Sequence, residues 1–214
     1  MCSLDKGIVI TGGHSALAEA IRKEFPDAKC PGKQELDVTS EPSVSSFLQG
    51  EAIDLLICCA GLSLDAPLLR LSEADWQASM DVNLTGAARV ASCVSRGMAR
   101  RGRGHIIFIG SYLAKHPGPG TAAYSSAKAG LEGLTRSLAA ELGASGIRVN
   151  LILPGFMETK MTARLKESVR ETIRSHHCLK RFNTPDRVAA FIRCLHEELT
   201  NTSGQTFNLD SRPL

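Results

Sequence analysis

The sequence has few aromatic residues, little excess charge and no long apolar run. Aromatic residues make up 5% of the 214 positions, with one Trp and two Tyr, which argues against a base-stacking surface for nucleic acid. The 25 Lys and Arg residues nearly balance the 22 Asp and Glu residues, and a net charge of +3 is too small to indicate nucleic-acid binding. No stretch approaches the roughly 18 apolar residues that span a bilayer, so we expect no membrane helix.

The cysteines also exclude several classes of protein. There are seven of them, an odd number, and no two have the CxxC spacing, which favours reduced thiols in a cytoplasmic protein over a disulfide framework. The first apolar run stops at Thr11 and is too short for the core of a signal peptide. His176-His177-Cys178 carries ligand-type side chains without a second cluster, so we expect no metal site.

Short apolar runs alternate with amphipathic stretches along the chain. We expect strands at 7–10, 53–59, 105–109, 147–153 and 206–209, with weaker extended pieces at 28–30 and 35–38. We expect helices at 15–25, after Ser40, at 73–100 in two segments around Asn83, and at 122–143, 161–174 and 185–199. Strands that alternate with helices predict a parallel sheet covered on both faces. No repeat or linker divides the chain, so we expect a single doubly wound, Rossmann-type α/β domain over residues 1–214.

A glycine-containing turn joins the first strand to the first helix. It reads Thr11-Gly12-Gly13-His14-Ser15-Ala16-Leu17-Ala18. In a doubly wound sheet this turn places helix amides against a cofactor pyrophosphate. A Gly-Gly pair alone more often marks only a tight turn. Ala16 and Ala18 occupy the second and third positions of the usual glycine pattern, and each adds a Cβ where phosphate or helix packing needs room.

A Ser, a Tyr and a Lys have a spacing that suggests acid–base chemistry. Tyr124 and Lys128 are four residues apart on an expected helix and so share one face. Ser111 follows a strand end, at the edge of the sheet where such folds bind ligands. A cation near a phenol lowers its pKa, which would make Tyr124 a proton donor and acceptor near neutral pH. The same Tyr-x-x-x-Lys spacing is also common in plain surface pairs.

Taken together, the motifs resemble the short-chain dehydrogenase/reductase family over nearly the whole chain. The matching features, in chain order, are Thr11-Gly12, Asp37-Val38, Ala60-Gly61, Asn83, Ser111, Tyr124 with Lys128, and Pro154-Gly155. The resemblance implies hydride transfer by a nicotinamide cofactor, with the protein supplying position and a proton.

The resemblance also implies a role for each catalytic residue. Tyr124 would be the general acid/base, and Lys128 would lower its pKa and bind the nicotinamide ribose. Ser111 would orient the substrate carbonyl. Asn83 would support a water in the proton relay, or else serve only as a polar residue at a helix kink.

The implied cofactor site is larger. Asp37 would meet the adenine, and Thr159 would contact the nicotinamide carboxamide. The full expected set is Thr11, Gly12, His14, Ser15, Ala16, Leu17, Lys33, Asp37, Val38, Ala60, Gly61, Tyr124, Lys128, Pro154, Gly155 and Thr159.

The chain departs from the family pattern at three places. Cys58-Cys59 stands where Asn-Asn is usual, and Asp210-Ser211-Arg212 stands where Asp-Gly-Gly is usual. Residues 28–37 are too few for the helix that normally joins the second and third strands, so the fold is compressed there. The first charged residue in this short loop is Lys33, ahead of Glu35, which favours NADP over NAD.

Within the family the likeness is greatest to 3-oxoacyl-carrier-protein reductases, through residues 83–86, 124–130, 146–150 and 154–162. Residues 154–193, the family's lid, hold nine basic and four acidic residues. A basic entrance could steer an acyl carrier protein or a phosphate-bearing thioester, although a solvated helix face has the same composition.

These features lead to one main functional hypothesis and two alternatives. The main one is NAD(P)H-dependent reduction of a ketone to a secondary alcohol, most simply of a 3-oxoacyl thioester on carrier protein or CoA. The alternatives are an enzyme for another carbonyl or alcohol (polyketide, steroid or sugar) and a degenerate, non-catalytic subunit. By resemblance we expect a homodimer or homotetramer that pairs helices 83–100 and 122–143, with close approach at Ala127, Gly130, Gly133 and Ala140.

Overall fold

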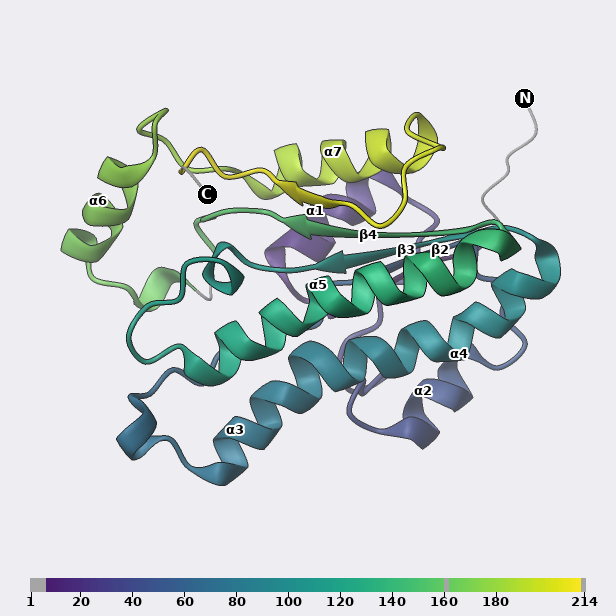
Figure 1. The fold of residues 1–214 in the computed structure, drawn as a ribbon, viewed down its shortest axis with the longest axis horizontal. Helices are drawn as coiled ribbons and strands as arrows, with labels where there is room; N and C mark the ends of the chain where they lie inside the picture. Colours follow the sequence, from purple (N-terminus) through teal and green to yellow (C-terminus); the bar gives the residue numbers. More distant parts are fainter. Residues whose placement is uncertain (1–6, 160–161, 213–214) are drawn as a thin grey trace.

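The fold is built on one parallel sheet of five strands. The computed structural model describes residues 7–159 and 162–212. The strands are β1 (Ile8–Thr11), β2 (Leu55–Cys58), β3 (Gly104–Ile109), β4 (Ile147–Leu153) and β5 (Thr206–Asn208), in the order β1-β2-β3-β4-β5 (Figure 1). All neighbours pair in parallel. The parallel α/β fold expected from the sequence is therefore confirmed.

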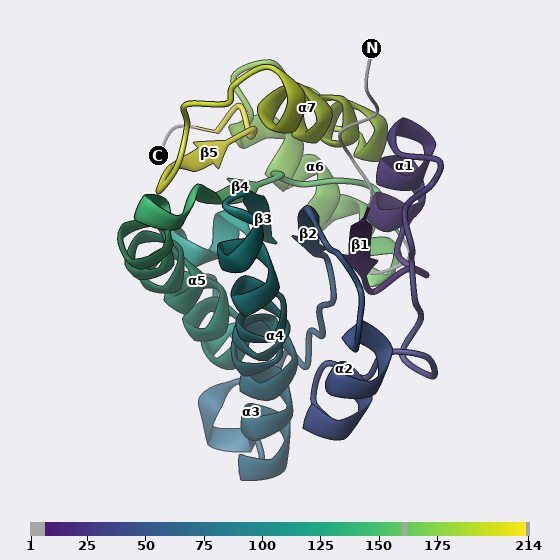
Figure 2. The ribbon, with the colours of Figure 1, turned by 90° about the vertical axis from the view of Figure 1, so that its right-hand side faces the viewer.

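Helices cover the sheet on both faces. Helix α1 (Ala16–Glu24) packs beside α7 (Pro185–Glu197) on one face. The opposite face carries α2 (Glu41–Leu48), α4 (Gly86–Arg101) and α5 (Ala122–Leu142) (Figure 2). Two further helices, α3 (Glu73–Met80) and α6 (Glu167–His176), lie toward the carboxyl ends of the strands. The loops at that edge, on the left in Figure 1, can therefore gather residues from distant parts of the chain.

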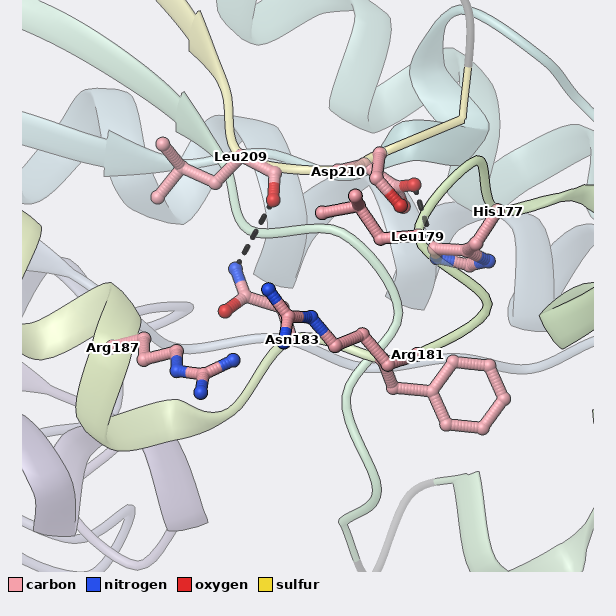
Figure 3. Close-up of a pocket in the computed structure, with 9 residues that line it drawn as sticks. His177, Leu179, Arg181, Asn183, Arg187, Leu209 and Asp210 are labelled. Atoms are coloured by element: carbon pink, nitrogen blue, oxygen red, sulfur yellow. Dashed lines mark hydrogen bonds and ion pairs between the residues drawn. The ribbon is translucent and has the colours of Figure 1, made fainter.

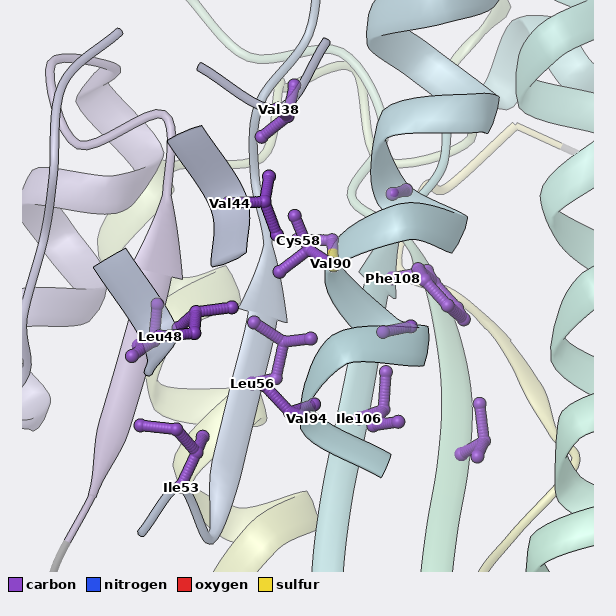
Figure 4. Packing of buried hydrophobic residues seen from close by; sticks show 14 of the residues in the cluster. Val38, Val44, Leu48, Ile53, Leu56, Cys58, Val90, Val94, Ile106 and Phe108 are labelled. Atoms are coloured by element: carbon purple, nitrogen blue, oxygen red, sulfur yellow. The ribbon is translucent and has the colours of Figure 1, made fainter. Parts of the chain in front are cut away.

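Two apolar clusters hold these layers together. Under α2 and α4, side chains such as Val44, Leu56, Val90 and Phe108 pack at 1% exposure or less (Figure 4). A second cluster joins α1 and α7 to the other face of the sheet. Because β1 to β4 are buried on both faces, their sequences are continuous apolar runs rather than alternating patterns.

The compressed segment differs from expectation in detail. Residues 28–30 form only an isolated bridge, in which Lys29 pairs with Val9 at the open edge of β1. Residues 35–38 form no strand, because a turn over residues 33–35 precedes them, in which the amide of Leu36 donates to the carbonyl of Gly32 at 2.9 Å. The Glu35 carboxylate closes the same turn by accepting from the Gly32 amide at 2.9 Å. This short stretch covers the edge of β1 and leads directly to α2.

The two helical segments expected on either side of Asn83 are confirmed, and the first helix of the lid is shorter than expected. A π-helical turn, Asp81–Thr85, separates α3 from α4. The helix expected at 161–174 is instead a 3-10 turn, Thr162–Arg164, followed by α6; Met161 lies outside the described residues. Among the described residues, no helix has both the length and the apolar character that a bilayer crossing requires.

Two of the four small residues expected at an oligomer interface pack inside the protomer. Ala127 is fully buried in this chain's own core, and a Cβ on Gly130 would come 2.8 Å from Leu84 Cδ2. These two positions therefore serve packing inside the protomer. Gly133 and Ala140 are exposed on α5, and the homo-oligomer stays a prediction.

Two neighbouring histidines, one buried and one half-buried, lie at the opposite edge of the sheet. His105, at the start of β3, is 1% exposed, and its Nδ1 lies 3.2 Å from Nδ1 of His196 on α7. Its Nε2 lies 3.1 Å from the Asn150 side-chain amide. Burial, with smaller contributions from Arg148 and His196, holds the pKa of His105 well below its ordinary 6.5.

The lowered pKa of His105 predicts a loss of stability in acid. The unfolded chain binds the proton more readily than the folded one, so stability should fall as the pH drops below about 6.5. Thermal unfolding at about pH 7.5 and pH 5.5 measures this for the wild type and for His105→Gln, which cannot take up the proton. We expect the variant to lose less stability on acidification, and an equal loss in both proteins would contradict the assignment.

Candidate active site

Three side chains meet at the carboxyl edge of the sheet, as the sequence predicts. Ser111 directly follows β3, while Tyr124 and Lys128 lie one helical turn apart in the first half of α5. The Ser111 hydroxyl hydrogen-bonds Tyr124 and also accepts from the amide of Leu113 at 3.2 Å. Lys128 Nζ lies 5.8 Å from the centre of the Tyr124 ring.

The surroundings of Tyr124 change the expected proton chemistry. Burial raises the pKa of the phenol, Asp65 adds to the rise, and the bond from Ser111 only partly offsets it. The lowering by Lys128 that the sequence suggests is not found, because the ammonium is held by the carbonyl of Ile109 at 2.7 Å. A phenol that keeps its proton at neutral pH is suited to donate it.

Lys128 is buried, and its neighbours are neutral. Its side chain is 4% exposed, and burial lowers its pKa to about 8. Burial also raises the pKa of Cys59 to about 12 and raises that of Cys58. The two cysteines that replace the family's amides are therefore protonated thiols beside Lys128, without the thiolate character that redox chemistry needs.

Asn83 braces the loop that follows β2. It is 1% exposed in the π-helical turn, and its amide donates to the carbonyls of Leu62 at 2.7 Å and Ser79 at 2.8 Å. Its Oδ1 accepts from the Leu62 amide at 3.2 Å. The side chain is thus fully engaged with backbone groups, and a contribution to a water relay would have to come from the main chain of the π-helical turn.

The glycine turn is pressed against the end of β2. Gly12 has φ +72°, and a Cβ there would come 2.8 Å from Ala60 Cα. A Cβ on Gly13 would come 2.1 Å from the carbonyl oxygen of Cys30. Thr11 Oγ1 accepts from the Ala60 amide at 3.1 Å. Both glycines are required by close backbone approach, and the turn brings Thr11 and Gly12 together with Ala60-Gly61 as expected.

The first turn of α1 can hold a pyrophosphate. Ser15 is the N-cap, and its hydroxyl accepts from the Ala18 amide at 3.2 Å. The amides of Ala16 and Leu17 remain at the helix end, where the helix dipole favours an anion. Ala18 is fully buried in the core between α1 and the sheet, so its extra Cβ is accommodated by packing. These residues fit a dinucleotide.

A hollow of about 520 Å³ lies where the adenine is expected and is lined by His14, Lys33, Gln34 and Asp37. Lys33 Nζ lies 3.9 Å from Asp37 Oδ2. Hydrogen bonds from the Thr39 hydroxyl and amide hold the pKa of Asp37 below its ordinary value. The sequence did not indicate Gln34; its position beside Lys33 in a turn was the available signal. The expected Val38 is 6% exposed and packs in the core.

The loop after β4 supplies the other end of the site. Gly155 has φ +80°, and a Cβ there would come 2.8 Å from Asp210 Oδ2. Thr159 is half-buried in a turn where its amide donates to Thr162 Oγ1 at 2.9 Å. Pro154 is buried at the end of β4, and its carbonyl accepts from the Asn183 side chain at 2.9 Å.

A second, small hollow of about 90 Å³ lies between the lid and the C-terminal segment (Figure 3). His177 is 2% exposed there, and its Nε2 lies 3.1 Å from Asp210 Oδ1 but is poorly aligned for a hydrogen bond. The sequence marked Asp210 only as part of an unusual C-terminal motif. Within residues 7–159 and 162–212, no three His, Cys, Asp or Glu side chains gather as metal ligands.

Comparisons with known proteins agree with this fold. A family model described as enoyl-(acyl carrier protein) reductase matches residues 7–211. A 3-oxoacyl-[acyl-carrier-protein] reductase of Thermotoga maritima is 35% identical over 213 residues, covering 92% of this chain and 87% of that protein. An acetoacetyl-CoA reductase of Allochromatium vinosum is 41% identical over 143 residues, covering 67% of this chain and 58% of that protein. A solved structure from Agrobacterium tumefaciens, described as a candidate gluconate dehydrogenase, superposes with a TM-score of 0.88 at 28% identity and covers 97% of this chain and 96% of that one.

Proposed function

Because the chain belongs to the short-chain dehydrogenase/reductase family and is an NAD(P)-dependent oxidoreductase, we propose that it reduces a 3-oxoacyl thioester to the 3-hydroxyacyl thioester with NADPH. One observation carries the proposal: the bonded Ser111–Tyr124 pair, with Lys128 beside it, lies at the same sheet edge as a turn that fits a dinucleotide. The names of the curated relatives support the substrate class.

Each side chain of the site has its own role in the proposed reduction. The nicotinamide, when bound, supplies the hydride. Tyr124 gives its phenolic proton to the carbonyl oxygen as charge develops there, and its raised pKa keeps that proton available at neutral pH. The Ser111 hydroxyl binds the same oxygen and orients it. Lys128 donates one N–H to the carbonyl of Ile109 and has two left for a ribose hydroxyl.

The raised phenol pKa supports reduction over oxidation as the favoured direction near neutral pH. Alcohol oxidation needs a phenolate base, which burial disfavours. Ketone reduction needs the protonated phenol, which burial favours. We therefore place ketone reduction ahead of alcohol dehydrogenation for this site.

The basic lid supports docking of an acidic carrier protein. Some of its charge is neutralised locally, since Arg170 lies 3.3 Å from Glu167 and 3.5 Å from Glu158. Lys166, Arg181 and Arg187 are exposed, and no carboxylate within the described residues pairs with them. These three side chains would raise the association rate with a carrier protein in a salt-dependent way.

A substrate panel tests the proposed function. Loss of NADPH absorbance is followed with acetoacetyl-CoA, with acetoacetyl-carrier protein, with an enoyl thioester and with a sugar acid or ketone. We expect turnover of the oxoacyl thioesters, with a salt-sensitive kcat/KM for the carrier-bound one alone. Turnover restricted to the enoyl thioester or to the sugar substrate would assign a different reaction to the site.

Lys33→Ala should weaken NADPH binding about tenfold and NADH binding much less, because one charge-assisted contact to a 2′-phosphate is removed. Lys33 lies on the hollow that faces the expected adenosine. Fluorescence titration with both cofactors measures the two dissociation constants. Lys23→Ala removes an equally charged, 72% exposed side chain on α1 and is the matched control. Equal losses for NADPH and NADH would contradict the preference for NADPH.

A further inference from the structure

Arg212 occupies a position where the family resemblance leads one to expect glycine, and its side chain contacts two other residues of the site. It pairs with Asp210, whose carboxylate is completely buried. Arg212 Nε lies 3.0 and 3.1 Å from the two carboxylate oxygens, and its backbone amide donates to Oδ1 at 2.8 Å. Such forked pairing of guanidinium and carboxylate is both strong and directional. The side chain of Arg212 is itself only 12% exposed.

The same guanidinium covers the residue next to Ser111. The Cζ atom of Arg212 lies 3.5 Å from the centre of the Tyr112 ring. Tyr112 also stacks on His116, with ring centres 4.6 Å apart at 17°. A planar cation this close to an aromatic face attracts it. The C-terminal segment is thereby fastened to the loop that begins with Ser111.

Asp210 fastens the segment to two further parts of the site. Its Oδ2 accepts from the Phe156 amide at 3.2 Å, in the loop after β4. Its Oδ1 faces His177, the residue that follows α6 in the lid (Figure 3). Two more bonds run from the lid side to the tail: the Cys178 amide donates to the Ser211 carbonyl at 3.1 Å and the Asn183 side chain to the Leu209 carbonyl at 3.2 Å.

We propose that Arg212 is a positioning residue, which locks the Ser111 loop to the loop after β4 and to the lid through its simultaneous contacts with Asp210 and Tyr112. The inference rests on the proposed function, because it assigns to Ser111 the task of holding the substrate carbonyl. With this lock in place, Ser111 and Tyr124 keep a fixed distance to the nicotinamide end of the site.

Arg212 also sets the charge state of Asp210. Burial pushes the pKa of Asp210 upward, but the hydrogen bonds and charge of Arg212 outweigh it and hold the pKa below its ordinary value. Without the guanidinium, the buried carboxylate would keep only the backbone amides of Phe156 and of residue 212, and the poorly aligned His177. Asp210 would then take up a proton at higher pH and release the three segments it holds together.

The test compares Arg212→Gln, Arg212→Lys and a control, Arg22→Gln, which removes an exposed arginine from the last turn of α1. With acetoacetyl-CoA and saturating NADPH, we expect Arg212→Gln to lower kcat by roughly 10- to 100-fold through misplacement of the carbonyl. The NADPH dissociation constant should stay within about twofold of wild type, since the dinucleotide site is untouched. The acid limb of the pH–rate profile should move to higher pH.

Arg212→Lys separates the effect of the positive charge from the effect of the planar guanidinium. A lysine keeps the positive charge beside Asp210 but cannot form the fork and the stack together. We expect the acid limb to return to its wild-type position while kcat stays low. Arg22→Gln should match wild type in every readout. If both Arg212 variants lower the melting temperature but leave kcat per cofactor-binding site and the pH profile unchanged, the residue is purely structural and the proposal is wrong.

Hydrogen exchange separates this inference from the proposed function. We expect amides 112–116 to exchange faster in Arg212→Gln than in wild type or Arg22→Gln, whatever substrate is reduced. Faster exchange in a protein that reduces no oxoacyl thioester would refute the proposed substrate and uphold the lock. Unchanged exchange in an active reductase would refute the lock and leave the proposed function standing.

Discussion

Tyr124→Phe should lower kcat for ketone reduction by roughly 10³-fold, since general acid catalysis contributes about 10²- to 10⁴-fold. The substitution removes one hydroxyl and keeps the ring. The phenol is the group that carries the proton toward the carbonyl, and its neighbour Ser111 cannot replace it because an aliphatic hydroxyl is a far weaker acid. Steady-state assay with acetoacetyl-CoA at saturating NADPH measures the loss.

Binding measurements decide whether the effect of Tyr124→Phe is chemical. The NADPH dissociation constant and the melting temperature should both stay close to wild type, because Tyr124 loses only its bond with Ser111. Ser126→Ala, which removes an exposed hydroxyl from the same helix, is the matched control and should be fully active. A Tyr124→Phe protein with more than about a tenth of wild-type kcat would remove the phenol from the proton-donor role.

Lys128→Met should abolish most activity and yet raise the melting temperature. The ammonium is buried and donates to the backbone carbonyl of Ile109, and a buried charge without an anion costs free energy. Methionine fills a similar volume without that cost. The loss in kcat/KM should reach roughly 10²-fold, because the N–H groups that would position the nicotinamide ribose disappear.

The pH dependence of stability tests whether the buried charge of Lys128 is what destabilises the wild type. The pKa of Lys128 falls from 10.5 to about 8 on folding, so the unfolded chain holds the proton more tightly between these values. Wild-type stability from this group therefore rises as the pH rises from about 8 to 10.5. The advantage of Lys128→Met should be largest near pH 7 and should shrink toward pH 10.5. A variant that is less stable than wild type at pH 7 would show that the ammonium is a net structural contact.

Much of the fold follows from local patterns. The apolar runs at β1 to β4 predict buried parallel strands, and Ser15 and Ser40 mark helix starts by capping the amides of Ala18 and Ser43. The break around Asn83 is also visible in the sequence. The weak extended piece at 28–30 does pair with β1 through Lys29, whereas the expectation of an extended piece at 35–38 was wrong, because the Gly32 turn there depends on contacts that no local pattern encodes.

The candidate site likewise has features that the sequence predicts and features that only the fold determines. The i, i+4 geometry of a helix places Tyr124 and Lys128 together, and a strand end places Ser111 near them, so the sequence predicts which residues form the candidate cluster. The family resemblance, rather than the glycine turn alone, predicts where a dinucleotide would lie, and the close approaches at Gly12 and Gly13 fit that prediction.

Only the tertiary structure decided how these groups behave. Whether the pKa of Tyr124 rises or falls depends on burial and on where the Lys128 ammonium is held, and both come from residues distant in the chain. The contact of Arg212 with Tyr112 joins positions a hundred residues apart and is equally invisible to local patterns. Membership of the site is a matter of short-range geometry, whereas its electrostatics and its rigidity are set by long-range packing, in which each charge feels the desolvation and the partners that the whole fold supplies.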